Sequence, residues 1–268
     1  MLFRSIMKCD DVIKLLEEEV PLEAAESWDN PGFLVGDRQK EVKKILVVLD
    51  ITNDVVEEAV KTGADFILAH HPVIFSKIKR CTSDDFLQRK LLRLIENKIC
   101  CYGMHTNYDV CRMCDAVAEK LGFYPDGVLE EAQDPRFQAE GKGIGMIGAF
   151  AGEKQLKDFA KEIKRAFGIP AVSVFGDPRI PIHKAAIVPG SGRSMTGIAA
   201  ARGADVLVTG DIGHHEGLDA ADMGLCVIDA GHYGLEQVFI DDMRELLQQK
   251  LPECEISSYK AGSPFQII

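Results

Sequence analysis

The chain has 268 residues, 46% hydrophobic and 27% charged, a balance typical of a globular protein with one large or two small domains. Its net charge of -11 disfavours nucleic-acid phosphates and anionic membranes as partners, although a local basic pocket can still bind a small anion. The first twenty residues lack the apolar core and cleavage site of a signal peptide, and no apolar run approaches the ~18 residues of a membrane span. We therefore expect a cytoplasmic protein whose eight cysteines are reduced thiols.

The first half alternates short apolar runs with helical patterns. After a helix at 10–18, the stretch 20–37 is predicted to be irregular because it contains Asn-Pro-Gly and Gly-Asp turn signals. The elements that follow are, in chain order, a strand at 43–50, a helix at 53–63, a strand at 64–71, a helix at 84–98 and a strand at 99–105. This order predicts a parallel or mixed sheet with helices packed on it.

The second half follows the same scheme. Residues 144–180 are predicted to supply a strand, a helix and a strand before it begins. The later elements are a strand at 183–190, a helix at 194–203, strands at 204–211 and 225–232, a helix at 233–250, and a short strand or two at 254–268. The fold class that we predict is therefore α/β, with two related lobes that are each a mixed sheet with flanking helices.

An internal repeat supports two related lobes. A shift of 140 residues places Lys44–Leu68 on Lys184–Val208 without a gap, and the Gly-Ala-Asp at the start of the second strand is identical in both segments. Because all strand–helix–strand units share a pattern, chance similarity is an alternative that this identity makes weaker. We expect a first lobe of residues 1–125 with about 237–268, and a second lobe of residues 126–236.

Each lobe has one His-x-x-x-acid motif, which follows its third predicted strand. His105 precedes Asp109 in HTNYD, and His232 precedes Glu236 in HYGLE. On a helical turn, side chains four residues apart share one face, so each motif can deliver a nitrogen and an oxygen to one ion. Two such motifs facing each other would form a metal site between the lobes.

The His70-His71-Pro72 sequence predicts that the site holds two ions. Pro72 favours an extended backbone at His71, and neighbouring side chains of an extended chain point to opposite sides. Two adjacent imidazoles therefore suit two ions better than one, and the two oxygens of Glu236 can bridge them. The predicted ligands are His70, His71, Asp109, His232 and Glu236. Imidazole and carboxylate suit Zn, Fe or Mn, and two such ions activate a bridging water for hydrolysis.

Other histidines have several interpretations. His214 and His215, in GDIGHHEG, bind substrate, orient the ligands or simply begin a helix, and we favour one of them as a proton donor. His105 contacts substrate or orients a ligand. His183 lies at a strand start and is interpreted as a surface or packing residue. The pair Cys111 and Cys114 is weak as a zinc site without a second pair, and one face of a helix explains it better.

The turn PGSGRS at 189–194 is glycine-rich and joins a strand to a helix. The backbone N–H groups of such a turn can bind a phosphate or carboxylate, with Gly190, Gly192 and Arg193 as the candidate contacts. Turns of this kind are also ordinary connections, so the sequence leaves both interpretations open.

Five motifs together resemble one known family. SWDNPGFLVGD, ILAHHPVIF, HTNYD, TGDIGHHE and DAGHYGLE are similar to the signatures of the GTP cyclohydrolase I type 2 homologue family, also called Nif-three-like. The resemblance implies a toroidal homohexamer of two-lobed subunits with metal sites facing the inner cavity. It also implies two divalent ions per subunit, the first held by His70, Asp109 and Glu236 and the second by His71, His232 and Glu236. Segment 144–180 is too short for the extra domain that some members carry.

The family name does not establish GTP as the substrate. We expect a metal-dependent hydrolase acting on a nucleotide-like or other small anionic substrate. Two alternatives use the same residues, namely a metal-binding or metal-delivery protein without turnover, and an oligomeric scaffold in which the ring itself is the function.

Overall fold

The computed structural model describes residues 7–268. It forms two compact units: a first unit of residues 7–108 with 239–261, and a second unit of residues 109–238 with 262–268. The expected absence of a signal peptide rests partly on residues 1–6, which lie outside the described residues. Between residues 7 and 268, no helix is both long and apolar enough to span a membrane.

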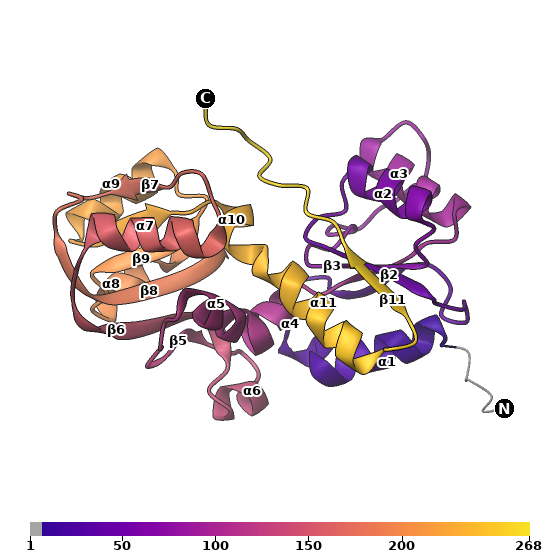
Figure 1. Cartoon of the computed structure of the whole chain (residues 1–268), viewed down its shortest axis with the longest axis horizontal. Helices are drawn as coiled ribbons and strands as arrows, with labels where there is room; N and C mark the ends of the chain where they lie inside the picture. The colour runs from indigo at the N-terminus through magenta and orange to yellow at the C-terminus, as the bar shows by residue number, and fades with distance from the viewer. Residues whose placement is uncertain (1–6) are drawn as a thin grey trace. The chain divides into compact units, whose positions relative to one another are not determined.

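The first unit is a five-stranded mixed sheet with helices on both faces. The strand order is β1-β4-β3-β2-β11, in which only β1 runs antiparallel to its neighbour. Figure 1 shows α2 and α3 on one face and α1 and α11 on the other. Its elements are α1 (Cys9–Glu19), η1 (Leu22–Ala24), β1 (Gly32–Val35), β2 (Lys44–Val48), α2 (Asn53–Thr62), β3 (Phe66–Ala69), α3 (Phe86–Glu96), β4 (Cys100–Gly103), α4 (Thr106–Tyr108), α11 (Val238–Lys250) and β11 (Glu255–Ser258).

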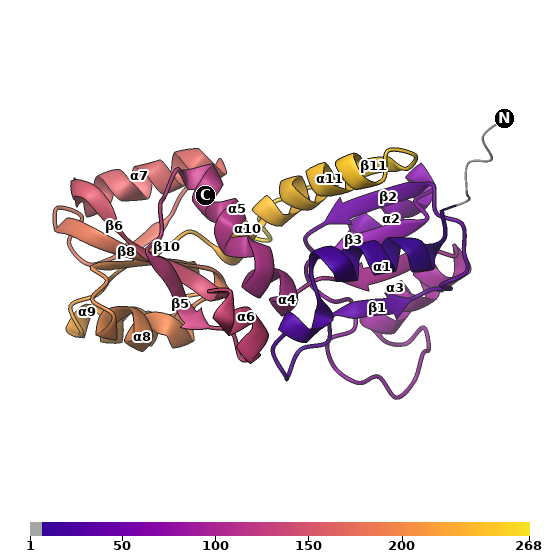
Figure 2. The ribbon, with the colours of Figure 1, turned by 90° about the horizontal axis from the view of Figure 1, so that it is seen from below.

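The second unit is a six-stranded mixed sheet. Its order is β5-β6-β8-β9-β10-β7, with β8, β9 and β10 parallel to one another. In Figure 2, α7 lies on one face of these strands and α8 and α9 lie on the other. Its elements are the π-helical turn η2 (Asp109–Met113), α5 (Cys114–Leu121), β5 (Gly127–Glu131), α6 (Pro135–Ala139), β6 (Gly143–Gln155), α7 (Leu156–Phe167), β7 (Ser173–Phe175), β8 (Pro181–Ser191), η3 (Arg193–Met195), α8 (Thr196–Ala201), β9 (Val206–Gly210), α9 (His214–Asp222), β10 (Cys226–Asp229) and α10 (His232–Glu236).

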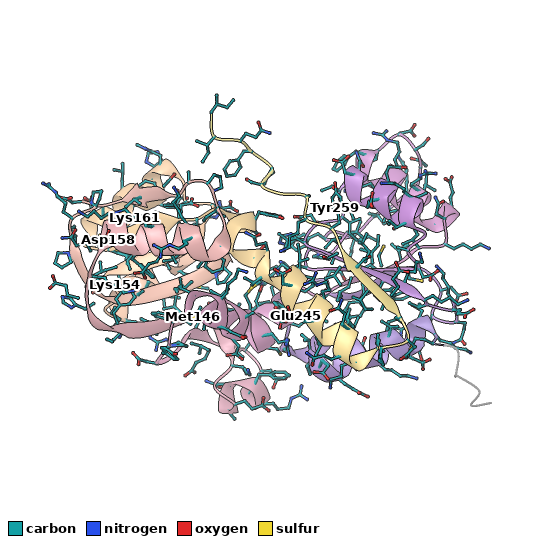
Figure 3. All side chains as sticks on the ribbon, in the orientation of Figure 1. Met146, Lys154, Asp158, Lys161, Glu245 and Tyr259 are labelled. Atoms are coloured by element: carbon teal, nitrogen blue, oxygen red, sulfur yellow. The ribbon has the colours of Figure 1, made fainter. Side chains whose placement is uncertain are left out.

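Apolar side chains of the central strands form the core of each unit. In the first unit, Leu46, Ile67 and neighbouring strand residues pack against Val56 of α2 and Leu94 of α3. In the second unit, the equivalent cluster packs against α8 and α9. The outward side of α7 instead carries an ion pair between Asp158 and Lys161, both visible in Figure 3. The predicted class, two mixed sheets flanked by helices, is confirmed.

The 140-residue repeat reappears as repeated hydrogen bonds. The Asp65 carboxylate accepts the backbone N–H groups of residues 43 and 44, and the Asp205 carboxylate accepts those of residues 183 and 184. Gly63 and Gly203 end the helices at φ +67° and +73°, the left-handed region that glycine favours. These shared contacts explain why Gly-Ala-Asp occurs in both segments. The lobe bounds expected from the sequence, near residues 125 and 237, stay a prediction.

Three segments differ from the elements expected. The stretch 20–37 is not wholly irregular, because β1 pairs with β4 from Gly32 onward. Residues 122–143 contain β5 and α6, and residues 106–121 form a helical segment with a π-helical turn. β1 and β5 are short edge strands, so their two-residue alternation is too brief to distinguish them from turns.

Candidate metal centre

His70 and His71 lie directly beyond the end of β3, where their backbone N–H groups still bond to the carbonyls of Val48 and Leu49. His70 is fully buried, and its Nδ1 lies 2.8 Å from the Met104 carbonyl oxygen. The Nδ1 atom of His71 lies 2.7 Å from a carboxylate oxygen of Asp50. A buried strand end therefore fixes the backbone of both residues, and one oxygen acceptor fixes each ring.

His105 follows β4 and is held in the same way. Its Nδ1 lies 2.8 Å from Asp29, whose fully buried carboxylate also accepts the backbone N–H and the hydroxyl of Thr106. Burial by itself would raise the pKa of Asp29, but the hydrogen bonds from His105 and Thr106 outweigh it and lower the pKa to about 2. Asp29 is thus an anchor for His105. The sequence analysis missed this role, because Asp29 lies 76 residues from His105 and no spacing pattern connects the two.

The three imidazoles form one cluster in the first unit. The ring centroids of His70 and His71 lie 4.9 Å apart, and those of His105 lie 5.3 Å and 5.5 Å from them. One ring nitrogen from each residue lies within 4.8 Å of the other two. Since an oxygen acceptor holds each Nδ1, metal binding is directed to Nε2, the arrangement usual around histidine ligands in metalloproteins.

The second unit presents an imidazole and a carboxylate from the first turn of α10. The Nε2 atom of His232 lies 3.0 Å from Glu236, and its Nδ1 lies 2.8 Å from Asp211. Glu236 is only 3% exposed, and a Cβ atom added to Gly190 would lie 2.3 Å from its Oε1. Gly190 is therefore required to make room for the carboxylate. The expected i,i+4 pairing is confirmed for His232 and Glu236.

The two His-x-x-x-acid motifs begin at different distances from the strands that precede them. Gly103 and Asp229 occupy equivalent positions, since they pair with Ala69 and Thr209, which are related by the 140-residue shift. His105 lies two residues beyond this point and His232 lies three beyond it. His105 therefore precedes a helical turn, whereas His232 is the first residue of one.

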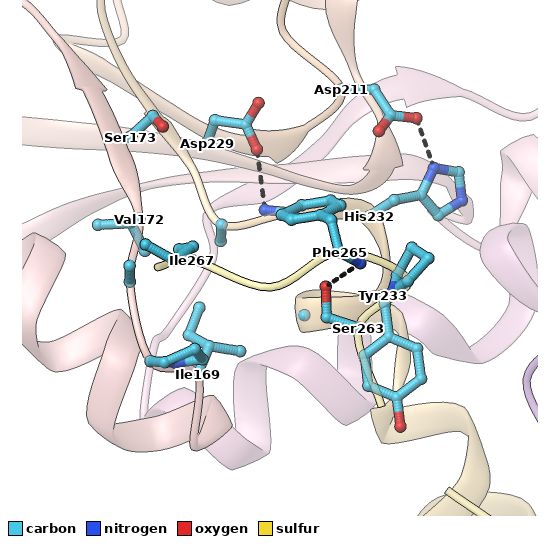
Figure 4. Close-up of a pocket in the computed structure, with 16 residues that line it drawn as sticks. Ile169, Val172, Ser173, Asp211, Asp229, His232, Tyr233, Ser263, Phe265 and Ile267 are labelled. Atoms are coloured by element: carbon cyan, nitrogen blue, oxygen red, sulfur yellow. Dashed lines mark hydrogen bonds and ion pairs between the residues drawn. The ribbon is translucent and has the colours of Figure 1, made fainter. Parts of the chain in front are cut away.

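A pocket of about 460 Å³ adjoins His232 in the second unit. Figure 4 shows Ile169, Val172 and Ile267 on its apolar side and His232 with Asp211 at its polar edge. The C-terminal segment contributes Phe265 to the lining. No lysine or arginine is among the described residues around this pocket, so the lining itself offers no positive charge to an anion.

Residues 7–262 match the family described as Duf34/NIF3 (NGG1p interacting factor 3). The chain belongs to the Duf34/NIF3 family. Its resemblance to the GTP cyclohydrolase I type 2 homologues is thereby confirmed.

Relatives and solved structures of this family match nearly the whole chain. A Clostridium perfringens protein named GTP cyclohydrolase 1 type 2 homolog is 36% identical, with 98% of this chain and 100% of that one aligned. The crystal structure of Staphylococcus aureus hypothetical protein SA1388 has a TM-score of 0.87 at 31% identity, covering 98% and 100% of the two chains. Reduced HcgD from Methanocaldococcus jannaschii has a TM-score of 0.80 at 32% identity, covering 94% and 97%.

The histidine and glutamate side chains of this Duf34/NIF3 protein could hold a metal ion. Imidazole nitrogens with carboxylate oxygens suit Zn, Fe or Mn. Two further features are consistent with metal binding. Oxygen acceptors hold the Nδ1 atoms of the histidines, and Gly190 leaves the space that the Glu236 carboxylate fills. Among the remaining predicted ligands, Asp109 begins the turn η2 in the second unit.

Among the other candidate site residues of the second unit, His214, His215 and Arg193 are exposed, whereas Gly190 and Gly192 are buried. His214 and His215 form the exposed first turn of α9, so the helix-start interpretation describes their backbone, while a proton-donor role stays a prediction. A Cβ atom on Gly192 would lie 2.3 Å from the Thr209 hydroxyl. Protein packing thus accounts for Gly190 and Gly192 without an anion, and Arg193 is exposed in the turn that follows.

Proposed function

We propose that the protein binds two divalent ions, Zn, Fe or Mn, and hydrolyses a small nucleotide-like or other anionic substrate. In this proposal His70, Asp109 and Glu236 would hold the first ion, and His71, His232 and Glu236 would hold the second. The observation that carries it is that both His71 and His232 are oriented by a carboxylate on Nδ1.

The chemistry of the proposed site divides between the ions and the chain. Two bound ions would lower the pKa of a water molecule and polarise a substrate oxygen. The chain orients the ligands through Asp50 and Asp211, and keeps Glu236 buried so that its charge is best balanced by cations. His105, His214 and His215 are the candidates for moving a proton to or from substrate.

The surroundings of His232 support one part of the proposed substrate, its ring. The adjoining pocket has an apolar side that suits a ring, and its polar edge carries Asp211 and Asp229 rather than a cation. An anionic group of the substrate would therefore depend on the ions, or on the turn with Gly190, Gly192 and Arg193, for its charge partner. The name GTP cyclohydrolase 1 type 2 homolog belongs to the relatives, and we do not extend GTP ring opening to this chain.

Two expectations from the sequence remain part of the proposal. The family resemblance suggests a toroidal homohexamer, and the composition suggests a cytoplasmic location. Size-exclusion chromatography with light scattering tests the first, and the same measurement on a ligand variant, combined with its biological activity, distinguishes a scaffold from an enzyme. A ligand variant that loses metal but remains a hexamer with full biological activity would favour the scaffold.

The test of the proposed function combines metal analysis with turnover. We expect about two ions per chain in the purified protein, and hydrolysis of at least one compound in a panel of nucleotides, phosphoesters and cyclic amides. His71→Ala and Glu236→Ala should each lower turnover by at least 100-fold while the far-UV circular dichroism is unchanged. The matched control is His183→Ala, which removes an exposed histidine at the start of β8. Tight two-ion binding without turnover on any panel member would contradict hydrolysis and favour metal delivery.

A further inference from the structure

We propose that the first unit contains a three-imidazole metal site of its own, formed by His70, His71 and His105, which can hold one divalent ion without any ligand from the second unit. The expected ions are borderline ones such as Zn²⁺, Co²⁺, Ni²⁺ or Cu²⁺, for which imidazole is a good ligand. This site goes beyond the proposed function because His105 takes the place of the three ligands from the second unit, Asp109, His232 and Glu236. It shares His70 and His71 with that arrangement, so the same two rings would serve a one-ion and a two-ion state.

The proximity of the three rings is the first argument. One nitrogen from each lies within 4.8 Å of the others, although the residues come from the ends of two strands. A tetrahedral ion with bonds of about 2.0–2.1 Å keeps its nitrogen ligands about 3.4 Å apart, so small side-chain rotations would complete the geometry. Three histidines with a fourth position left for water form a recurrent zinc arrangement.

The orientation of the rings is the second argument. The acceptors that hold the three Nδ1 atoms are Met104 O for His70, Asp50 for His71 and Asp29 for His105. These bonds select one tautomer, with the proton on Nδ1 and the lone pair on Nε2. A carbonyl and two carboxylates also make the imidazoles better electron donors, and such partners typically contribute 10–100-fold to metal affinity. Packing alone would not require an oxygen acceptor at the same nitrogen of all three rings.

The surroundings of His105 supply a specific reporter. Trp28 is the only tryptophan of the chain, and its ring centroid lies 6.2 Å from that of His105. Phe75 approaches the same imidazole at 6.3 Å, so two exposed aromatic rings border the cluster. A paramagnetic ion bound by His105 would lie close enough to Trp28 to quench its fluorescence.

The experiment removes the second unit's ligands and retains the first unit's. The variant Asp109→Asn/His232→Gln/Glu236→Gln is titrated with Co²⁺, while Trp28 fluorescence and the visible absorption of Co²⁺ are recorded. We expect one equivalent to bind, with quenching of Trp28 and the absorption of a low-coordinate nitrogen site. Adding His105→Ala should lower the affinity at least 100-fold and abolish quenching at one equivalent, whereas adding His183→Ala should change neither.

Two outcomes would overturn the site. One is a folded triple variant that binds no Co²⁺, and the other is binding that His105→Ala leaves unchanged. Should the triple variant fail to fold, Glu236→Gln alone removes the bridging ligand, and the effect of His105→Ala on its first Co²⁺ equivalent gives the same answer. The proposed function is judged separately, from the two-ion content and turnover of the unaltered protein, so either proposal can fail while the other stands.

Discussion

The segments 44–71 and 184–211 share a backbone pattern but present different side chains where their strands end. The shift of 140 residues places Asp50 on Gly190 and His71 on Asp211. In the first unit the strand ends supply both members of a pair, since Asp50 holds His71. In the second unit the strand end supplies the carboxylate Asp211, and the imidazole comes from His232 in the helix that follows β10.

The repeat retains a common backbone frame but not a common set of candidate ligands. Both units orient an imidazole by a carboxylate at Nδ1, but the two partners occupy different positions. The exchange of Asp50 for Gly190 is what admits the buried carboxylate of Glu236 beside the strand. A duplicated unit can thus acquire complementary ligands by substitutions at strand ends, where the core packing is not disturbed.

The largest effect should come from filling the space beside Glu236. Gly190 has φ +77°, and in Gly190→Ala the new Cβ would meet Glu236 Oε1 at 2.3 Å. We expect the carboxylate to be displaced, with loss of at least tenfold in metal affinity and destabilisation of about 3 kcal/mol or more from strain and clash together. Metal content and urea unfolding measure the two quantities.

Gly203→Ala is the matched control for this variant. Gly203 has a similar φ of +73°, but nothing lies within 4 Å of an added Cβ. It should therefore show only the backbone cost, about 1–2 kcal/mol, with unchanged metal content. Equal destabilisation and equal metal content in the two variants would mean that Gly190 is a turn glycine and does not shape the site.

An intermediate effect is expected from the two orienting carboxylates. Asp50→Asn and Asp211→Asn should each lower metal affinity by about 10–100-fold without changing the number of ions bound. Asn tolerates the positive φ of +59° at position 211, so backbone strain should not contribute to the affinity change in Asp211→Asn. Competition with a chromophoric chelator measures the affinity, and Asp54→Asn, in the first turn of α2, controls for lost surface charge. An effect of only one variant would show that the two pairs are not equivalent.

The sequence predicted the frame well because its signals are local. Gly63 and Gly203 end helices, and the apolar runs before His70 and Asp211 have the length of buried strands. Pattern alone did not reveal the edge strand β1 or the short β5. Their positions depend on pairing with distant residues, Gly32 with Gly103 and Gly127 with Ile147.

The sequence predicts the proximity of His232 and Glu236, but it does not predict the side chains that orient the imidazole rings. His232 and Glu236 have a spacing that indicates a shared face, and this pairing is present. Asp29 is 76 residues from His105, so no spacing rule connects them. The fully buried side chain of Asp29 becomes meaningful only when the strands bring its loop beside β4. Tertiary contacts of this kind carry most of the second layer around a metal site.

The smallest expected effect is the difference in the free energy of unfolding between variants at two equivalent aspartates. Asp65 and Asp205 each accept two backbone N–H groups, so Asp65→Asn and Asp205→Asn should each cost about 1.5–3 kcal/mol. Asp65 also pairs with Lys40 at 3.0 Å, whereas the position equivalent to Lys40 is Ile180. We expect Asp65→Asn to cost more by about 0.5 kcal/mol, because a partly exposed ion pair contributes little. Urea unfolding at pH 7 measures both.

The stability cost of Asp65→Asn should depend on pH, and the pKa of Asp65 gives the direction of that dependence. Burial would raise the pKa of Asp65, but the backbone N–H of Lys43 and the ammonium of Lys40 outweigh it and lower the pKa below the ordinary 3.8. A carboxyl whose pKa is lower in the folded state stabilises the protein above its unfolded pKa and loses this contribution as pH falls through the folded value. The cost of Asp65→Asn should therefore be full at pH 7 and shrink below pH ~4. A cost that persists unchanged at pH 3 would mean that packing of the side chain, rather than its charge, secures the start of β2.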